Sequence, residues 1–189
     1  MSLRDAIKSE PDGVAAVFRV ADALGLERRE LAHVINLESG WNPLSRNSID
    51  ARGLLQWTPR TRRNMKLDPL PDTIKGQAQT IELFFRSLGR IPPGDVYVAT
   101  AAPALLGKPD ATIAYAVGSP EWKANPSLRG PSNGDITAGS IRRAGTPPSS
   151  LTLPTLAELD RMQPAPGAAR GGFGILLLLV ALAWDSKRR

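Results

Sequence analysis

The chain has 189 residues, no cysteine, one histidine and a formal net charge of +6. The lack of cysteine excludes disulfides, thiolate zinc sites and cysteine nucleophiles, and the single His33 excludes a metal site built from several histidines. The length allows one domain with an extension, or two small domains. The positive charge favours acidic partners. Because the basic residues form no long block, we expect no nucleic-acid binding.

Two helices are expected in the first part of the chain. Apolar residues at helical spacing predict a helix from Val14 to Leu24, with Asp12 as its N-cap and Gly25 as its end. A second helix should follow over residues 27–37, so that Glu38 lies at its end.

Residues 39–61 are rich in Gly, Pro, Asn and Ser, which is typical of turns, and further helices are expected beyond them. No stretch shows the sustained two-residue alternation of a strand, so the predicted fold class is all-α. The further helices are residues 73–88, with Asp72 as N-cap and Gly89 as the end, residues 95–106, a short segment around Tyr115, and residues 137–143 behind the N-cap Thr137.

Composition divides the chain into three parts. Residues 1–145 have the composition of a globular domain. Residues 146–170 contain five prolines with scattered Gly, Ala and Ser, which is typical of a linker that buries no core, with room for one or two helical turns at residues 155–162. Residues 171–189 form the C-terminal part.

The C-terminal part contains an uncharged apolar run, Gly171–Trp184, followed by a basic tail. As a helix this run would span roughly 20 Å, which is shorter than the hydrocarbon core of a bilayer. Bilayer thinning and flanking residues can make up the difference. We therefore interpret residues 171–189 as a transmembrane-like anchor with a basic tail. A buried core helix or an oligomerisation helix is the alternative.

The most informative stretch is residues 38–61, which read ESGWNPLSRNSIDARGLLQWTPRT. It combines Glu-Ser, Trp-Asn-Pro, Ala-x-Gly-Leu-x-Gln and Pro-x-Thr. This pattern resembles the catalytic motif of the soluble lytic transglycosylase (SLT) family, in the lysozyme-like superfamily. Asn47 and Asp50 depart from the family pattern. The residues that carry the resemblance are Glu38, Ser39, Trp41, Asn42, Pro43, Ala51, Gly53, Leu54, Gln56, Pro59 and Thr61.

A second and weaker resemblance lies at residues 113–118. There Tyr115 matches the tyrosine of the family's Ala-Tyr-Asn-Ala-Gly segment, which lines the cleft near the acid. Ala116 and Val117 depart from that segment, so its asparagine is missing.

The resemblance implies a lysozyme-like catalytic domain, placed at residues 1–145, that cleaves the MurNAc–GlcNAc bond of peptidoglycan. It implies that Glu38 is the catalytic acid and base, and that no cofactor and no metal take part. It also implies that Ser39, Gln56 and Tyr115 bind the substrate, with Gln56 either holding the saccharide or orienting Glu38.

The chemistry of glycosidic cleavage leads to the same glutamate. Breaking the bond requires a proton on the leaving oxygen, and a carboxylic acid supplies it only if it is still protonated near neutral pH. Burial against apolar side chains raises the pKa of a carboxyl in this way. Because Glu38 follows an apolar helix face and precedes Trp41, we expect its pKa to be raised.

The remaining aromatic residues and His33 are interpreted more simply. We expect Trp41 to belong to the core, whereas Trp57 and Trp122 are candidates for stacking on sugar rings. His33 follows Glu30 by three positions on a helix, and we assign it no role.

The sequence is compatible with two other functions. Asp50 is a possible second carboxylate, which would make the protein a hydrolytic muramidase, although a turn residue is the simpler interpretation. The departures at Asn47 and beside Tyr115 leave room for a non-catalytic, glycan-binding or structural virion protein on a lysozyme-like scaffold.

Location is inferred from the two ends of the sequence. Residues 1–11 have no apolar run of the secretory type. Together with the apolar run Gly171–Trp184, this leads us to expect a phage virion or infected host envelope, with the catalytic domain facing the cell wall and aiding genome entry. A bacterial cell envelope is the alternative. The expected partners are peptidoglycan strands, a membrane and other virion proteins.

Overall fold

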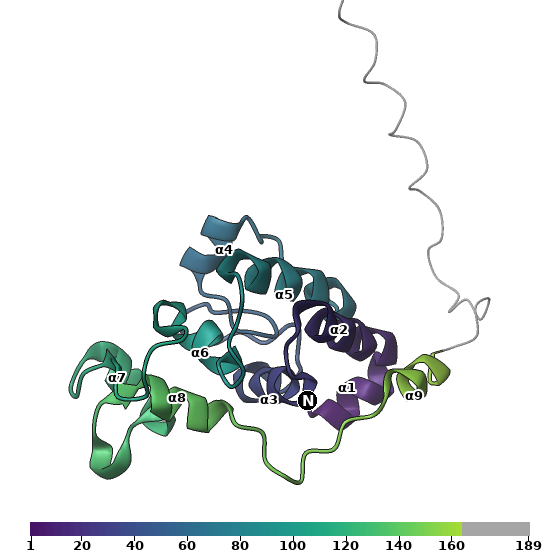
Figure 1. Ribbon diagram of the computed structural model, residues 1–189. Coiled ribbons are helices and arrows are strands. Elements are labelled where there is room, and N and C mark those ends of the chain that lie inside the picture. Colours follow the sequence, from purple (N-terminus) through teal and green to yellow (C-terminus); the bar gives the residue numbers. More distant parts are fainter. Residues whose placement is uncertain (164–189) are drawn as a thin grey trace, which may run out of the picture.

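The computed structural model describes residues 1–163, which are mostly helical (Figure 1). This architecture agrees with the predicted all-α class apart from two short strands, β1 (Ile113–Tyr115) and β2 (Ile136–Thr137), which pair antiparallel. The α-helices are α1 (Leu3–Ser9), α2 (Pro11–Leu24), α3 (Arg28–Ser39), α4 (Pro59–Met65), α5 (Ile74–Leu88), α6 (Val96–Ala101), α7 (Pro120–Ala124), α8 (Ala138–Gly145) and α9 (Leu156–Arg161), and the 3-10 turns are η1 (Pro103–Leu105), η2 (Pro126–Leu128) and η3 (Pro131–Asn133).

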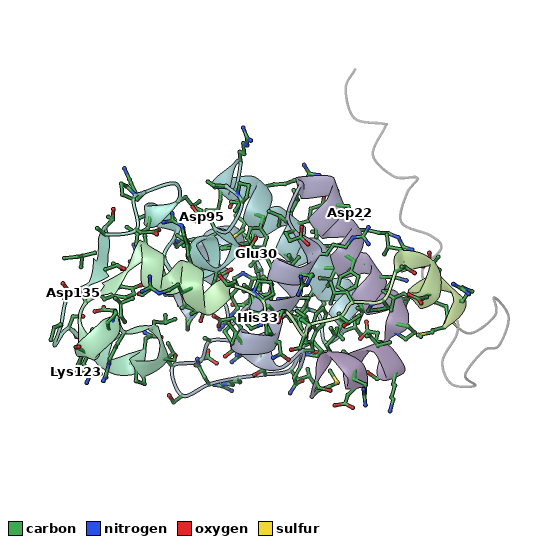
Figure 2. The ribbon with its side chains drawn as sticks, turned by 60° about the horizontal axis from the view of Figure 1, so that its bottom comes forward. Asp22, Glu30, His33, Asp95, Lys123 and Asp135 are labelled. Carbon is green, nitrogen blue, oxygen red and sulfur yellow. The ribbon has the colours of Figure 1, made fainter. Side chains whose placement is uncertain are left out.

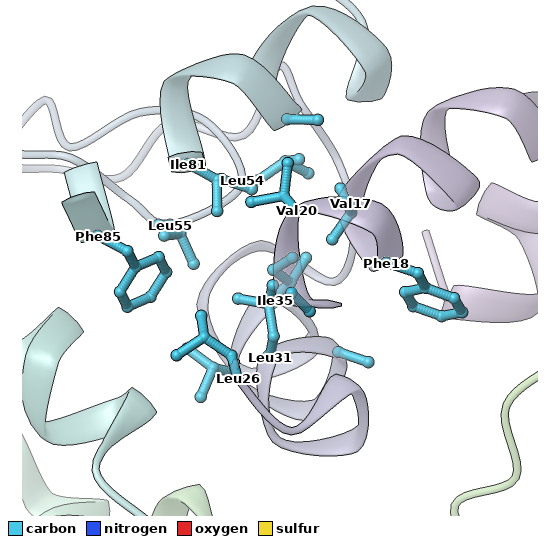
Figure 3. Packing of buried hydrophobic residues seen from close by; sticks show 14 of the residues in the cluster. Val17, Phe18, Val20, Leu26, Leu31, Ile35, Leu54, Leu55, Ile81 and Phe85 are labelled. Atoms are coloured by element: carbon cyan, nitrogen blue, oxygen red, sulfur yellow. The ribbon is translucent and has the colours of Figure 1, made fainter. Parts of the chain in front are cut away.

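The main core forms where α2 lies against α5 and α3 packs beneath them (Figures 1 and 3). Apolar positions of α2 recur at helical spacing and are buried, as its pattern predicts. Trp41 is fully buried, and its ring meets that of Phe18 edge-on, with centroids 6.5 Å apart. The prediction that Trp41 belongs to the core is confirmed.

The start of α2 differs from the prediction, whereas its end agrees. Pro11 occupies the first turn, where its fixed φ suits a helix start, so Asp12 lies inside the helix and is not its N-cap. Glu10 precedes the helix, and its carboxylate accepts a hydrogen bond from the backbone N–H of Ile74 (2.9 Å) at the start of α5. Gly25 ends α2 with a φ of 66°, as predicted.

Other helix boundaries need similar corrections. Thr73, and not Asp72, caps α5, because its hydroxyl accepts the N–H of Gly76. The predicted helix 95–106 stops at Ala101 because Pro103 cannot continue it. The short helix α1 was not predicted, although a capping box begins it. Thr137 caps α8 as predicted.

The segment around Tyr115 is a strand, so the helix expected there is wrong. Residues 113–115 pair with residues 136–137, a contact between distant parts of the chain that local composition does not reveal. A second, smaller apolar cluster lies beside this sheet and joins α6 to α8. Its buried members are Val98, Leu128, Ile136 and Ile141.

Residues 146–163 do not behave as a linker that buries no core. They run past α3 and α1 and end in α9, which packs on α2 (Figure 1). Leu159 is fully buried there, and Asp160 forms an ion pair with Arg19 (2.5 Å). Leu153 and Leu156 pack against the main core, and Leu159 is part of it. The expectation is therefore corrected for these residues.

Nothing in residues 1–163 forms a helix with the length and apolarity that crossing a bilayer requires. The predicted anchor Gly171–Trp184, with the rest of residues 164–189, lies outside the described residues, so that prediction stands untested.

We predict that Leu159→Ala lowers the free energy of unfolding by about 2–4 kcal/mol, because it removes a fully buried side chain between α9 and α2. Urea unfolding of the full chain measures this loss. Met162→Ala is the matched control, since that side chain is 55% exposed and its truncation should cost little. Equal stability of the two variants would show that α9 does not dock on the domain.

Candidate active site

The motif loop after α3 is held in place by one buried amide side chain. Gln77 of α5 is fully buried, and its oxygen accepts the backbone N–H of Leu54 (2.7 Å). Its nitrogen donates to the carbonyls of Pro43 and Pro71, both at 2.7 Å. Gly53 has a φ of 80° and lies so close that a Cβ atom would come within 2.6 Å of the Gln77 oxygen. Sequence reasoning did not single out Gln77, because it occupies an ordinary helix position.

Glu38 lies in the last turn of α3, just before the helix ends at Gly40. Its side chain is only partly exposed. Burial raises the pKa of the Glu38 carboxyl to about 7, and a hydrogen bond with Tyr97 limits the rise. The raised pKa that the sequence predicts is confirmed. A carboxyl with this pKa holds its proton in a large fraction of molecules at neutral pH.

Tyr97 comes from α6, which packs against α3. Burial, together with the charge of Glu38, raises the pKa of its hydroxyl, so this hydroxyl stays protonated and donates to the Glu38 carboxylate. Sequence reasoning missed Tyr97. The chain has only two tyrosines, and the family motif drew attention to the other one.

Comparison with known protein families finds a match over part of the chain. Residues 16–78 match the model of the Transglycosylase SLT domain. The match supports the SLT family, which is lysozyme-like. It begins within α2, ends within α5 and contains Glu38, whereas Tyr97 lies outside it. No curated protein and no solved structure matches the chain significantly.

Tyr115, the tyrosine singled out by the motif, lies on β1, beyond the residues that match the family model. Its hydroxyl donates to the carbonyl of Ala101 (3.3 Å), and its ring packs with the second apolar cluster. The side chain in contact with the acid is therefore Tyr97. A role of Tyr115 in substrate binding stays a prediction.

Asp50 is enclosed by arginines within the SLT motif. Its φ of 59° is that of a turn residue, and its carboxylate pairs with Arg46 (2.6 Å), Arg52 (2.7 Å) and Arg62 (3.0 Å). The hydrogen bond from Arg52, aided by Arg62 and by the charge of Arg46, lowers the pKa of the Asp50 carboxyl. This arrangement fits the turn interpretation.

Arg62 is the nearly buried centre of the arginine cluster, and the sequence did not single it out. It donates to the backbone carbonyls of Asp50 (2.7 Å) and Trp57 (2.9 Å) and to the carboxylate of Asp68 (2.8 Å). Its planar fork of donors therefore ties the motif loop to the segment after α4.

Ser39 and Gln56 both bond to the backbone and not to Glu38. The Ser39 hydroxyl donates to the carbonyl of Ile35 in the preceding turn (3.1 Å). The Gln56 amide nitrogen donates to the carbonyls of Ser45 (3.2 Å) and Gly53 (3.0 Å) and so stiffens the loop. Their predicted contacts with substrate remain untested.

The two remaining tryptophans differ in exposure, because Trp57 is buried and Trp122 is partly exposed. Trp57 is buried and meets Phe84 edge-on, so the expectation that it stacks on sugar rings is wrong. The ring of Trp122 is covered on one face by the guanidinium of Arg129, 3.7 Å from the centroid. Stacking of sugar on Trp122 stays a prediction for its other face.

Two further buried carboxyls, Glu30 and Asp95, which are labelled in Figure 2, hold the segment that leads into α6. Glu30 is buried in α3, and its carboxylate accepts the backbone N–H of Gly94 (3.3 Å); burial raises its pKa. Asp95 is also buried and pairs with Arg142. Gly94, the partner of Glu30, and Asp95 precede Tyr97 by three and two residues, so both contacts lie at the start of α6.

A hollow beside α1 and α3 does not include Glu38. Its volume is about 1090 Å³, and it lies between α1, α3 and residues 148–152, with His33 and Asn36 in its wall. Glu38 is not among its lining residues. His33 also contacts the carbonyl of Ala144 (3.2 Å). We place the candidate active site by the environment of Glu38 and not by the volume of this hollow.

Among residues 1–163, no group of acidic and histidine side chains could hold a metal ion.

We predict that Glu38→Gln makes stability less dependent on pH. The folded carboxyl has a pKa of about 7 against an ordinary value of 4.5, so the wild-type folded state loses stability as the pH rises from 4.5 to 7. The glutamine amide does not titrate, so it makes no pH-dependent contribution to stability in this range. Thermal unfolding at about pH 4.5 and pH 8 measures the difference. Equal pH dependence in both proteins would contradict the raised pKa.

Proposed function

We propose that this protein is a lytic transglycosylase that cleaves the MurNAc–GlcNAc bond of peptidoglycan, with Glu38 as its only catalytic carboxyl. The observation that carries the proposal is the position of Glu38 at the start of the SLT motif, with its pKa raised to about 7. A general acid works best when its pKa lies near the working pH.

One carboxyl is sufficient for this reaction. Protonated Glu38 gives its proton to the glycosidic oxygen, and the bond between that oxygen and C1 of the MurNAc residue breaks. The carboxylate formed then takes the proton of the C6 hydroxyl, whose oxygen attacks C1 and closes a 1,6-anhydro ring. The proton count balances, Glu38 ends protonated, and neither water nor a cofactor is consumed. Tyr97, hydrogen-bonded to the carboxyl, steadies its charged form between the two steps.

Hydrolysis by a muramidase is less well supported, because it normally uses a second carboxylate to activate water or to act as nucleophile. Asp50 was the candidate for that role. Its carboxylate is held by three arginines, and its lowered pKa makes it a weak base.

A non-catalytic scaffold is also less well supported. Keeping a carboxyl in an environment that disfavours its charge costs stability at neutral pH, and such groups gather at active sites. A protein that only bound glycan would gain nothing from the raised pKa of Glu38.

We also propose attachment to a membrane through Gly171–Trp184, in a virion or in a cell envelope. This proposal rests on the apolar sequence alone. A role in genome entry and contacts with other virion proteins are expectations of the same kind.

The test is to incubate the full chain with purified peptidoglycan and to analyse the released muropeptides. We expect fragments with 1,6-anhydromuramyl ends from the wild type, and a fall in release of about 100-fold or more for Glu38→Gln. Glu121→Gln is the matched control, because that carboxylate is exposed on α7 and should be dispensable.

Three results would contradict the proposal. Reducing ends in place of anhydro ends would show hydrolysis. Binding of peptidoglycan without release of fragments would show a scaffold. Equal activity of the wild type and Glu38→Gln would show that the acid has been assigned to the wrong residue.

A further inference from the structure

We propose that α8 is the element that holds Tyr97 against Glu38, with Gly145 and Arg142 as its positioning residues. This inference rests on the proposed function for its importance, but the contacts that carry it are independent of any reaction. The family match ends at residue 78, so both α6 and α8 lie beyond it.

Gly145, the last residue of α8, makes room for Tyr97. It is buried, and a Cβ atom built on it would lie 2.4 Å from the Tyr97 Cβ and 3.3 Å from its ring. Its φ is not in the left-handed region, so alanine can adopt the same backbone there. Glycine is therefore needed at this position only because Tyr97 occupies the space that a side chain would fill. Any larger residue must push Tyr97 or α8 aside.

Arg142, one turn earlier on α8, fixes the start of α6. Its guanidinium bonds both carboxylate oxygens of Asp95, the residue that directly precedes α6. It also bonds the carboxylate of Asp110 (2.5 Å) and the carbonyl of Lys108 (2.8 Å). Asp95 is 1% exposed, so its charge depends on this partner. Tyr97 follows Asp95 by two residues.

The same helix is tied to the helix that carries the acid. The carbonyl of Ala144 on α8 contacts the His33 ring on α3 at 3.2 Å. Helix α8 therefore contacts both α6, which carries Tyr97, and α3, which carries Glu38, and it sets their relative position.

Charged groups near this arrangement come from three elements. Glu30 on α3 accepts the backbone N–H of Gly94, just before α6. Arg142 on α8 pairs with Asp95, the residue that follows Gly94. Tyr97 is the one titratable side chain among the described residues that bears on the pKa of Glu38. A change at Gly145 should thus reach Glu38 through Tyr97.

The experiment is an NMR titration of the Glu38 side-chain carboxyl in the full chain, which needs no catalysis. Tyr97→Phe removes the donor to the carboxylate, so the pKa of Glu38 should rise by about 0.5–1 pH unit. We expect Gly145→Ala to raise it in the same direction. The double variant should show no further rise, because both changes remove the same hydrogen bond.

Two variants complete the test. Arg142→Lys keeps the charge but loses the two-point contact with Asp95, and it carries the test if Gly145→Ala does not fold. Arg143→Ala is the matched control, since Arg143 is exposed on the same helix and should leave the Glu38 pKa unchanged.

The proposal is overturned if Tyr97→Phe raises the pKa of Glu38 while Gly145→Ala and Arg142→Lys leave it unchanged. It is also overturned if Gly145→Ala raises the pKa equally with and without the Tyr97 hydroxyl. Failure of the proposed function would look different, because the titration shifts would persist in a protein that releases no muropeptides.

Discussion

The structure depends on the partial burial of one carboxyl. In the reaction that we propose, Glu38 must be shielded enough to keep its proton near neutral pH and exposed enough to contact a glycan. The end of α3 meets both needs, because the helix is anchored in the main core by Leu31 and Ile35 while its last turn, at Gly40, opens into the motif loop. The free energy lost by desolvating the carboxyl is offset by the packing of α2, α3 and α5.

Tyr97 on α6 modifies the pKa that burial at the end of α3 gives to Glu38. Burial raises the pKa of Glu38, and the Tyr97 hydroxyl limits that rise by stabilising the carboxylate. This balance suits a group that must act as an acid and then as a base in one reaction cycle. The family match covers the element that supplies the acid, whereas the element that supplies the tyrosine lies outside it. Helix α8 contacts both elements, through Gly145 against Tyr97 on α6 and through Ala144 against His33 on α3.

Sequence reasoning succeeded where the signal was local. The spacing of apolar residues predicted α2, α3 and α5, and the environment of Glu38 was predicted from its place after an apolar helix face. It failed where distant segments meet. The strand at Tyr115, the docking of Leu159 and the approach of Tyr97 to Glu38 all depend on contacts between residues far apart in the chain. No local pattern records such contacts.

The pH–rate profile of peptidoglycan cleavage tests the central claim most directly. If protonated Glu38 starts the reaction, kcat/KM must fall as the pH rises through the pKa of that group in the free enzyme, about 7. A profile that declines with an apparent pKa near 4.5, the ordinary value of a glutamate, or one that stays level through neutrality, would show that a shielded acid at Glu38 does not drive the chemistry.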